Sequence, residues 1–230
     1  MKFYSKTVLI TGAGGNLGYA VASAFAEEGA KLVLFDRNPS KLGEFEGSHM
    51  VCGVDLVNQS DVSENVRAAV ERFGQIDVVC NLAGGFSMGS PVHESSEDDI
   101  EHLLDLNVRT LLNVVRAVAP SMIGNGGGRF INVGANSAAK GVGLMSGYCA
   151  TKDMVARITE SMSAELRDSN INVNAVLPSI IDTPENRSAM PDADHDRWVK
   201  PRALADVIQF LASDAARAIH GALIPVTNRS

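Results

Sequence analysis

The chain has 230 residues, of which 45% are hydrophobic and 20% charged, and its formal net charge is −7 at pH 7. This composition is typical of a soluble globular protein with a large core, and the acidic balance argues against nucleic acid as a partner, because phosphate binding requires a basic surface. Three cysteines without metal-ligand spacing predict no metal site and a reducing, cytoplasmic location. No leader and no apolar run of membrane-spanning length is recognisable, so no membrane partner is expected.

Apolar runs rich in β-branched residues alternate along the chain with amphipathic segments. The apolar runs predict seven strands, at residues 7–11, 31–36, 49–55, 76–83, 128–134, 171–178 and 221–226. The segments between them predict helices, including one that ends at Gly29, one that ends at Gly74, and two long ones at 96–122 and 148–168. Continuously apolar strands that alternate with helices indicate a parallel sheet covered on both faces. The predicted fold class is α/β, a single doubly wound Rossmann-type domain over residues 1–230.

One connection is long for a compact domain. Residues 179–200 are polar and interrupted by prolines, and such segments often serve as lids or binding loops. We therefore expect this segment to be the substrate loop. Met190 and Trp198 could close over a flat substrate ring, and hydrophobic anchoring of the loop is an equally open alternative.

A glycine-rich turn joins the first predicted strand to the first predicted helix. Glycines at 12, 15 and 18 allow a tight turn, a close approach of backbone to a pyrophosphate, and helix N–H groups that point at the anion. This strand–turn–helix context favours a dinucleotide site over a purely structural turn. Asp36 ends the second strand, where its carboxylate would accept hydrogen bonds from ribose hydroxyls and repel a 2′-phosphate. NAD(H) is therefore the favoured cofactor, and NADP(H) stays open because Arg37 follows directly.

Tyr148 and Lys152 have the spacing that brings a phenol and an ammonium group together on a helix. They are four residues apart, so both side chains lie on one face if the segment is helical. A free phenol titrates near ~10. We expect the neighbouring ammonium and the positive end of the helix to lower the pKa of Tyr148. Tyr148 would then exchange a proton with a substrate near neutral pH.

These motifs resemble the short-chain dehydrogenase/reductase family along nearly the whole chain. The resemblance rests on the glycine turn after Thr11, Asp55, the sequence NLAGG at 81–85, Asn107, the Tyr148–Lys152 pair, and the stretch from Pro178 to Thr183. It implies an NAD(P)-dependent oxidoreductase acting on a small molecule. It further implies a homodimer or homotetramer paired through the two long helices.

The resemblance also implies roles for individual residues. Lys152 would grip the nicotinamide ribose and Asn107 would anchor a water near the lysine. Tyr148, Lys152 and Asn107 form the implied catalytic set. The cofactor-binding residues implied by the turn and by the resemblance are Gly12, Gly15, Asn16, Leu17, Gly18, Asp36, Arg37, Asp55, Leu56, Asn81, Ala83, Gly84, Tyr148, Lys152, Pro178, Ile181 and Thr183.

Three positions depart from the family pattern. Asn16 stands where a motif glycine usually falls, and Ser179 replaces the glycine that commonly follows Pro178. Counting back from Tyr148 by the family's spacing gives Ala135 in place of the catalytic serine. Ser137 is an alternative hydroxyl, because alternate residues of an extended strand point to the same side. A solvent-exposed loop serine is the other interpretation of Ser137.

A narrower resemblance accounts for Ala135. The sequences GANSAAKG and DTPENRSAMPDAD are similar to those of the dihydropteridine reductases, a subgroup with alanine at the serine position and a preference for NADH. This resemblance implies a quinonoid dihydropteridine-like substrate, with Phe86 at its edge. Two alternatives stay open. One is a reductase of 3-oxoacyl-acyl-carrier-protein or of small ketones and alcohols, and the other is a non-catalytic dinucleotide-binding sensor.

Overall fold

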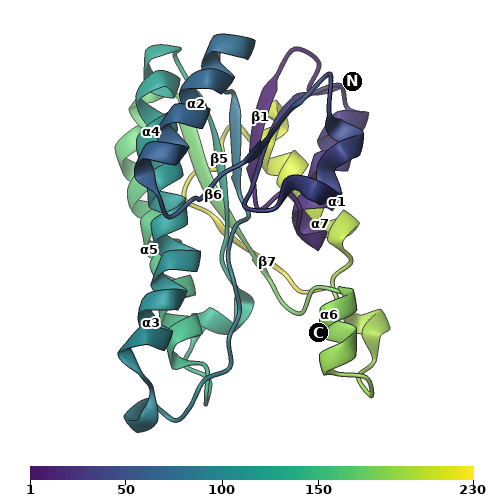
Figure 1. The fold of residues 1–230 in the computed structure, drawn as a ribbon, viewed down its shortest axis with the longest axis vertical. Coiled ribbons are helices and arrows are strands. Elements are labelled where there is room, and N and C mark those ends of the chain that lie inside the picture. Colours follow the sequence, from purple (N-terminus) through teal and green to yellow (C-terminus); the bar gives the residue numbers. More distant parts are fainter.

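The structure is a computed structural model that describes residues 1–230. Its centre is one sheet of seven parallel strands in the order β3-β2-β1-β4-β5-β6-β7, with helices on both faces (Figure 1). The strands are β1 Thr7–Thr11, β2 Lys31–Asp36, β3 Met50–Gly53, β4 Val78–Asn81, β5 Gly128–Val133, β6 Ile171–Pro178 and β7 Leu223–Val226. The predicted α/β doubly wound fold with seven parallel strands is confirmed. Four of the strands are shorter than their apolar runs.

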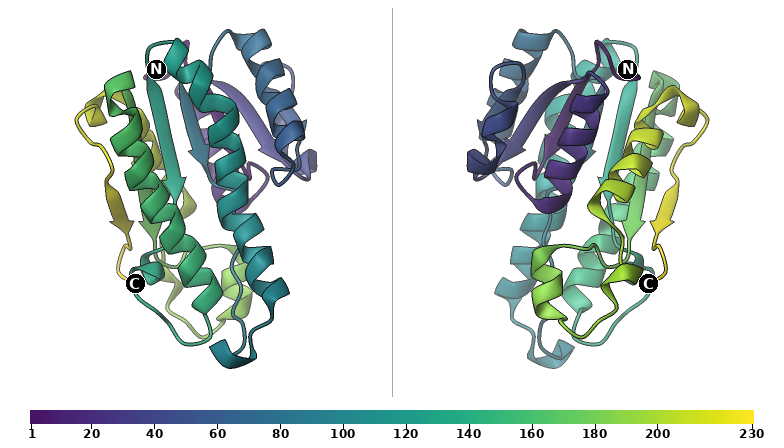
Figure 2. Two further views of the ribbon diagram at one scale, coloured as in Figure 1. Left: turned by 90° about the vertical axis from the view of Figure 1, so that its left-hand side faces the viewer. Right: turned by 90° about the vertical axis from the view of Figure 1, so that its right-hand side faces the viewer.

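Seven α-helices accompany the sheet. They are α1 Asn16–Glu27, α2 Gln59–Phe73, α3 Glu97–Leu104, α4 Thr110–Gly124, α5 Ser146–Leu166, α6 Pro184–Ala189 and α7 Pro201–Ala212. Figure 2 shows α1 and α7 next to each other on one face of the sheet, and α2, α4 and α5 on the other. None of these helices combines the length and the apolar character that crossing a bilayer requires.

Two cores fill the space between the sheet and its helices. Val8 and Ile10 of β1 belong to the core under α1 and α7, whereas Leu9 between them belongs to the core under α2 and α4. Successive side chains of a strand point to opposite faces. A strand covered on both faces must therefore be apolar at every position, which is why these runs read as continuous in the sequence.

The long helix predicted at 96–122 is interrupted. It consists of α3, a π-helical segment at Asp105–Arg109, and α4. A π-segment inserts an extra residue into the turn, which apolar periodicity does not reveal. This segment carries Asn107, whose side chain accepts the backbone amide of Gly85. The second long helix runs from Ser146 to Leu166, close to the predicted 148–168.

The segment 179–200 is more ordered than its sequence suggests. It contains α6 and a 3-10 turn at His195–Arg197, and it lies beyond the carboxyl ends of the strands (Figure 1). Ile181 and Val199 pair in a parallel bridge, so the two ends of the segment are joined. The Asp182 carboxylate binds both Arg187 and Lys200. These contacts position the segment above the edge of the sheet at which the glycine turn lies.

A substitution at Gly18 would test how tightly the glycine turn is packed. A Cβ at this position would stand 2.1 Å from the carbonyl oxygen of Gly12 and 2.7 Å from Cα of Ala13. We expect Gly18→Ala to lower the free energy of unfolding by about 2–3 kcal/mol, because overpacking against backbone outweighs the ~1 kcal/mol that alanine gains in a helix. Urea unfolding followed by circular dichroism measures this change. Gly43→Ala, where an added Cβ meets nothing within 4 Å, is the control and should change stability by less than about 0.5 kcal/mol. Equal losses in both variants would contradict the packing argument.

Candidate functional site

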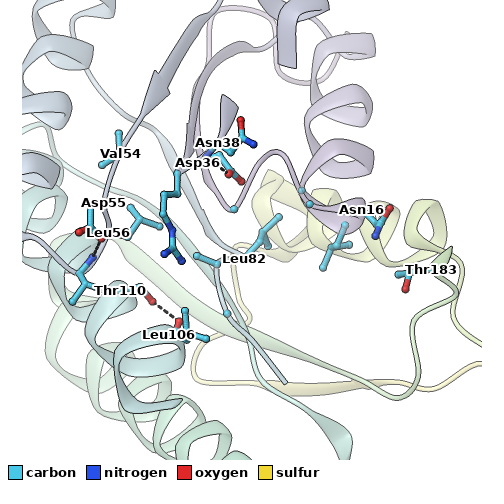
Figure 3. Close-up of a pocket in the computed structure, with 18 residues that line it drawn as sticks. Asn16, Asp36, Asn38, Val54, Asp55, Leu56, Leu82, Leu106, Thr110 and Thr183 are labelled. Atoms are coloured by element: carbon cyan, nitrogen blue, oxygen red, sulfur yellow. Dashed lines mark hydrogen bonds between the residues drawn. The ribbon is translucent and has the colours of Figure 1, made fainter. Parts of the chain in front are cut away.

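A cavity of about 510 Å³ opens at the carboxyl ends of β1, β2 and β4 (Figure 3). In a parallel doubly wound sheet, ligands bind in the crevice at this edge. Of the predicted cofactor-binding residues, those that line the cavity are Gly12, Gly15, Asn16, Leu17, Gly18, Asp36, Arg37, Asp55, Leu56, Ala83, Gly84 and Thr183. Sequence reasoning missed six further lining residues, Asn38, Val54, Val57, Leu82, Leu106 and Thr110. Most of these directly neighbour a predicted residue, which is the signal that could have found them.

The glycine turn forms one end of the cavity. Gly12 has a φ of +64°, and a Cβ there would lie 3.0 Å from Cα of Ala83, so the turn and the loop after β4 are in close contact. Helix α1 begins at Asn16 with Gly15 as its N-cap, and no side chain caps its first amides. The first turn of a helix leaves unpaired N–H groups and a partial positive charge. This end of the cavity is therefore suited to an anion such as a pyrophosphate.

Asp36 is held rigidly at the middle of the cavity. Its carboxylate accepts the amide of Gly14 through Oδ2 and the amide of Asn38 through Oδ1, both at 2.9 Å. Figure 3 shows Asp36 and Asn38 between Asn16 on one side and Asp55 and Leu56 on the other. A negative charge fixed in this way favours a ligand with hydroxyl donors and opposes one with a second anionic group.

Asn16 connects the glycine turn to α6, and Thr183 caps the first turn of that helix. Asn16 Nδ2 donates to Oε2 of Glu185 at 2.7 Å, and Thr183 caps α6 by accepting the amide of Asn186 at 3.2 Å. The asparagine that replaces a family glycine therefore bridges to the 179–200 segment.

Lys152 lies behind the wall of the same cavity. Its side chain is buried, and Nζ donates to the carbonyl of Val133 at 3.0 Å. A Cβ at Gly84, which lines the cavity, would be 3.1 Å from Nζ. Burial lowers the pKa of the ammonium group to about 8. Lys152 is thus separated from the cavity only by a residue without a side chain.

Asn107 fixes the backbone of the loop after β4. Its Oδ1 accepts the amide of Gly85 at 2.9 Å, and its Nδ2 donates to the carbonyl of Gly85 and to Oγ1 of Thr151, both at 3.2 Å. Thr151 in turn donates to the backbone carbonyl of Tyr148 at 3.0 Å. The π-helical segment therefore joins the cavity wall to the helix that carries Tyr148. The role of Asn107 in anchoring a water stays a prediction.

The expected lowering of the pKa of Tyr148 is wrong for the free protein. Burial raises the pKa of its phenol to about 12. Tyr148 does lie in the first turn of α5, but its ring packs edge-on against Phe86, with 5.0 Å between the ring centroids. The ammonium of Lys152 donates to Val133 and is itself buried. Removal of water from the phenolate therefore outweighs the helix end.

The geometric reason for choosing Ser137 is also wrong. Strand pairing ends at Val133, Ala135 is still extended with φ −153° and ψ 139°, and residues Asn136–Ala139 form a 3-10 turn. The alternation that would place residues 135 and 137 on one side does not continue through that turn. The carbonyl of Ser137 accepts from Sγ of Cys149, which is buried, at 3.7 Å.

The remaining predicted residues lie away from the cavity lining. Asn81 is buried at the end of β4, where its Nδ2 donates to Oδ1 of Asn132 at 2.9 Å. Pro178 ends β6, and the carbonyl of Ile181 accepts Nδ2 of Asn186 at 2.7 Å.

The residues predicted to contact substrate differ in exposure. Trp198 is only 3% exposed and its ring packs on His195, an arrangement that favours anchoring of the loop. Phe86 is 61% exposed and Met190 is 36% exposed, so both side chains remain accessible.

Comparison with known proteins identifies the family. The family described as short chain dehydrogenase matches residues 6–194. The chain is 31% identical over 241 residues to the 3-oxoacyl-acyl-carrier-protein reductase of Thermotoga maritima, covering 98% of each chain. It is 33% identical over 187 residues to the sorbitol dehydrogenase of Cereibacter sphaeroides, covering 79% of this chain and 73% of that protein. The crystal structure of NAD+-bound xylitol dehydrogenase matches with a TM-score of 0.91 and 28% identity, covering 99% of this chain and 100% of that one.

The chain therefore belongs to the short-chain dehydrogenase family, and it is an oxidoreductase. The family binds nicotinamide dinucleotides, in agreement with the predicted cofactor class. The relatives carry several different substrate names, so the comparisons identify a family and not the dihydropteridine reductase subgroup.

The burial of Lys152 predicts a pH-dependent stability. Its pKa is about 8 in the folded protein and 10.5 as the reference value, so between these two values the unfolded chain binds more protons. The free energy of unfolding must then rise with pH in this window. From about pH 7 to about pH 9.5, the cofactor-free protein should gain about 2 kcal/mol relative to Lys152→Met. Urea unfolding at each pH measures the difference. Lys140→Met removes an exposed lysine and should leave the pH slope unchanged, whereas a flat difference for Lys152→Met would refute the burial argument.

Proposed function

We propose that this short-chain dehydrogenase is an NAD(H)-preferring reductase in which Tyr148 delivers a proton to an electron-poor, conjugated substrate such as a quinonoid dihydropteridine. The observation that carries this proposal is the position of Lys152 directly behind Gly84, one helical turn from Tyr148. The cation thus lies just behind the lining of the large cavity, and the proton donor lines the small cavity that contains Ser146 and Gly147. The segment 179–200 is the proposed substrate loop of a single domain.

The residues present fit a dinucleotide. The uncapped start of α1 would receive the pyrophosphate, and Asp36 would accept the hydroxyls of the adenosine ribose. Asp55 and Leu56 line the end of the cavity where the adenine would lie. When bound, the nicotinamide would supply the hydride for reduction. Lys152 would reach the nicotinamide ribose past Gly84, where a larger residue would obstruct it.

Tyr148 is protonated at neutral pH in the free protein, since its pKa is raised to about 12. A phenol in this form carries the proton that reduction of a substrate requires. Phe86 packs against the ring of Tyr148 and leaves most of its own surface accessible. A flat substrate could therefore lie against Phe86 while its reacting atom faces the phenol.

The substrate class follows from the residue at the position of the family's serine. Ala135 is buried and offers no hydroxyl, and Ser137 lies in a 3-10 turn. Loss of one donor to a developing oxyanion costs on the order of 2.7–4 kcal/mol of transition-state stabilisation. A ketone would lose this stabilisation, whereas a conjugated quinonoid ring distributes the developing charge. Ala135 therefore favours a quinonoid substrate.

Reduction of a 3-oxoacyl or small ketone substrate is the second candidate. One of the relatives described above is named a 3-oxoacyl-acyl-carrier-protein reductase, two are named polyol dehydrogenases, and serine hydroxyls line the cavity that contains Tyr148. The small cavity that Tyr148 lines also includes Ser87, Ser95 and Ser146. Any of these could replace the missing hydroxyl.

A homodimer or homotetramer also stays a prediction. It is supported by Ile100 on α3 and Met154 on α5, whose side chains remain exposed on the single chain.

Cofactor preference depends on Asp36. We expect Asp36→Ser to lower the ratio of kcat/KM for NADH to that for NADPH by about tenfold or more, because the substitution removes the charge that opposes a 2′-phosphate. Initial rates with both cofactors measure this ratio. Asp192→Ser removes an exposed carboxylate outside the cavity and should leave the ratio unchanged. An unaltered preference in Asp36→Ser would contradict the assignment.

Two substitutions test the catalytic assignment. Tyr148→Phe should reduce kcat for NADH-dependent reduction by about 10²–10⁴, the contribution of a general acid. Ser137→Ala should stay within about twofold of the wild type. Tyr4→Phe, at a tyrosine that is 74% exposed, is the matched control. Substrates to compare are a quinonoid dihydropteridine, a 3-oxoacyl thioester and a small ketone.

The outcomes separate the candidate functions. Turnover of the quinonoid substrate that survives Ser137→Ala supports the proposal. Turnover of ketones alone, lost in a variant of Ser137 or Ser146, supports the second candidate. Binding of NADH in fluorescence titrations without turnover of any substrate would instead support a non-catalytic sensor.

A further inference from the structure

A second cavity, of about 820 Å³, opens at the amino ends of the strands. Its lining includes Lys6 before β1, Asp77 before β4, Arg129 at the start of β5, and Gln209 and Phe210 of α7. Since all strands are parallel, this cavity lies at the opposite edge of the sheet from the dinucleotide cavity. Its volume is within the range of small-molecule sites.

The charge of Arg129 is only weakly compensated in this cavity. Its side chain is 13% exposed, and its only hydrogen bond runs from Nη1 to the carbonyl of Gly128 at 2.9 Å. The nearest carboxylate is that of Asp214, 3.7 Å from Nη2 and fully exposed. An exposed pair at this distance contributes little. A largely buried guanidinium normally requires a close anion, because removing its charge from water is costly.

The unpaired donors lie on one edge of the guanidinium. Nε of Arg129 is buried and has no acceptor, while Nη1 is already bonded to Gly128. The Nε–Nη2 edge of arginine matches the two oxygens of a carboxylate or a phosphate. Nε2 of Gln209 is a second buried donor without an acceptor, and α7 packs against β5, which carries Arg129.

Several other charged groups of the cavity have close partners. The Asp77 carboxylate accepts from Lys6 Nζ at 3.0 Å, the amide of Thr7 at 2.9 Å and Gln75 Nε2 at 2.8 Å. Arg202 is bound to Glu27 and Asp206. Arg129 and Gln209 therefore stand apart as the unsatisfied donors. Phe210, 46% exposed, supplies an apolar wall beside them.

We infer that Arg129 and Gln209 form a second binding site, which holds the oxyanion group of a small carboxylate or phosphate ester. The oxyanion sits on the Nε–Nη2 edge of Arg129, Gln209 donates to the same group, and the body of the ligand lies against Phe210. Water alone would satisfy the hydrogen bonds but would leave the charge of Arg129 only weakly compensated.

Thermal unfolding tests this site without any need for turnover. The protein is saturated with NAD+, so that the start of α1 is occupied, and receives inorganic phosphate or malonate at constant ionic strength against chloride. Both probes present the oxyanion chemistry, and the comparison shows whether a phosphate or a carboxylate is preferred. We expect at least one probe to raise the Tm in a saturable manner.

Substitutions assign the effect to the second cavity. Arg129→Met and Arg129→Lys should each weaken the apparent Kd by about tenfold or more, because neither keeps the two-donor edge. Gln209→Leu should weaken it severalfold. Arg202→Met, which alters an already paired guanidinium in the same cavity, should leave it within about twofold.

Two results would overturn the inference. One is the absence of a saturable effect from either probe, and the other is an effect of equal strength in the wild type and Arg129→Lys. If Arg129→Met does not fold, Arg129→Lys and Gln209→Leu carry the comparison. Because the readout is stability, a failure here is distinguishable from a failure of the proposed reductase activity.

Discussion

The ammonium group of Lys152 lies inside the protein, and the carbonyl of Val133 at the end of β5 is its acceptor. Removing a cation from water is costly, so its position must be fixed by the packing around it. Gly84 leaves room for this position, since a Cβ there would stand 3.1 Å from Nζ and 2.8 Å from Oδ1 of Asn107. The absence of one side chain allows the cation, the amide and the cavity to meet.

The neighbourhood of Lys152 also explains why Tyr148 does not titrate as its spacing suggests. Two residues four positions apart share a helix face, but the pKa of a phenol depends on what surrounds it. Here Phe86 and the protein interior remove water from the phenol, and its pKa rises to about 12. The phenol therefore keeps its proton at neutral pH in the ligand-free protein. The same motif in a wetter pocket would behave differently.

The two edges of the sheet place different demands on polar groups. At the carboxyl edge the glycine turn leaves amides free, and Asp36 is fixed by the amides of Gly14 and Asn38. At the amino edge Asp77 is fully satisfied while Arg129 is not. A parallel sheet separates these groups by the length of its strands, so the two cavities do not overlap.

The sequence by itself determined the sheet, the glycine turn, Asp36 and most of the cavity lining, because local spacing and continuous apolar runs encode them. The tertiary structure alone decided four other features. The π-segment at Asn107 has no signature in apolar periodicity, and the 3-10 turn at Ser137 ends an alternation that was expected to continue. The pKa of Tyr148 depends on the loss of water around it, and the unpaired state of Arg129 depends on which acceptors α7 and β4 bring near it. Burial and pairing depend on contacts between segments that are distant in the sequence, and for this reason local sequence patterns do not predict them.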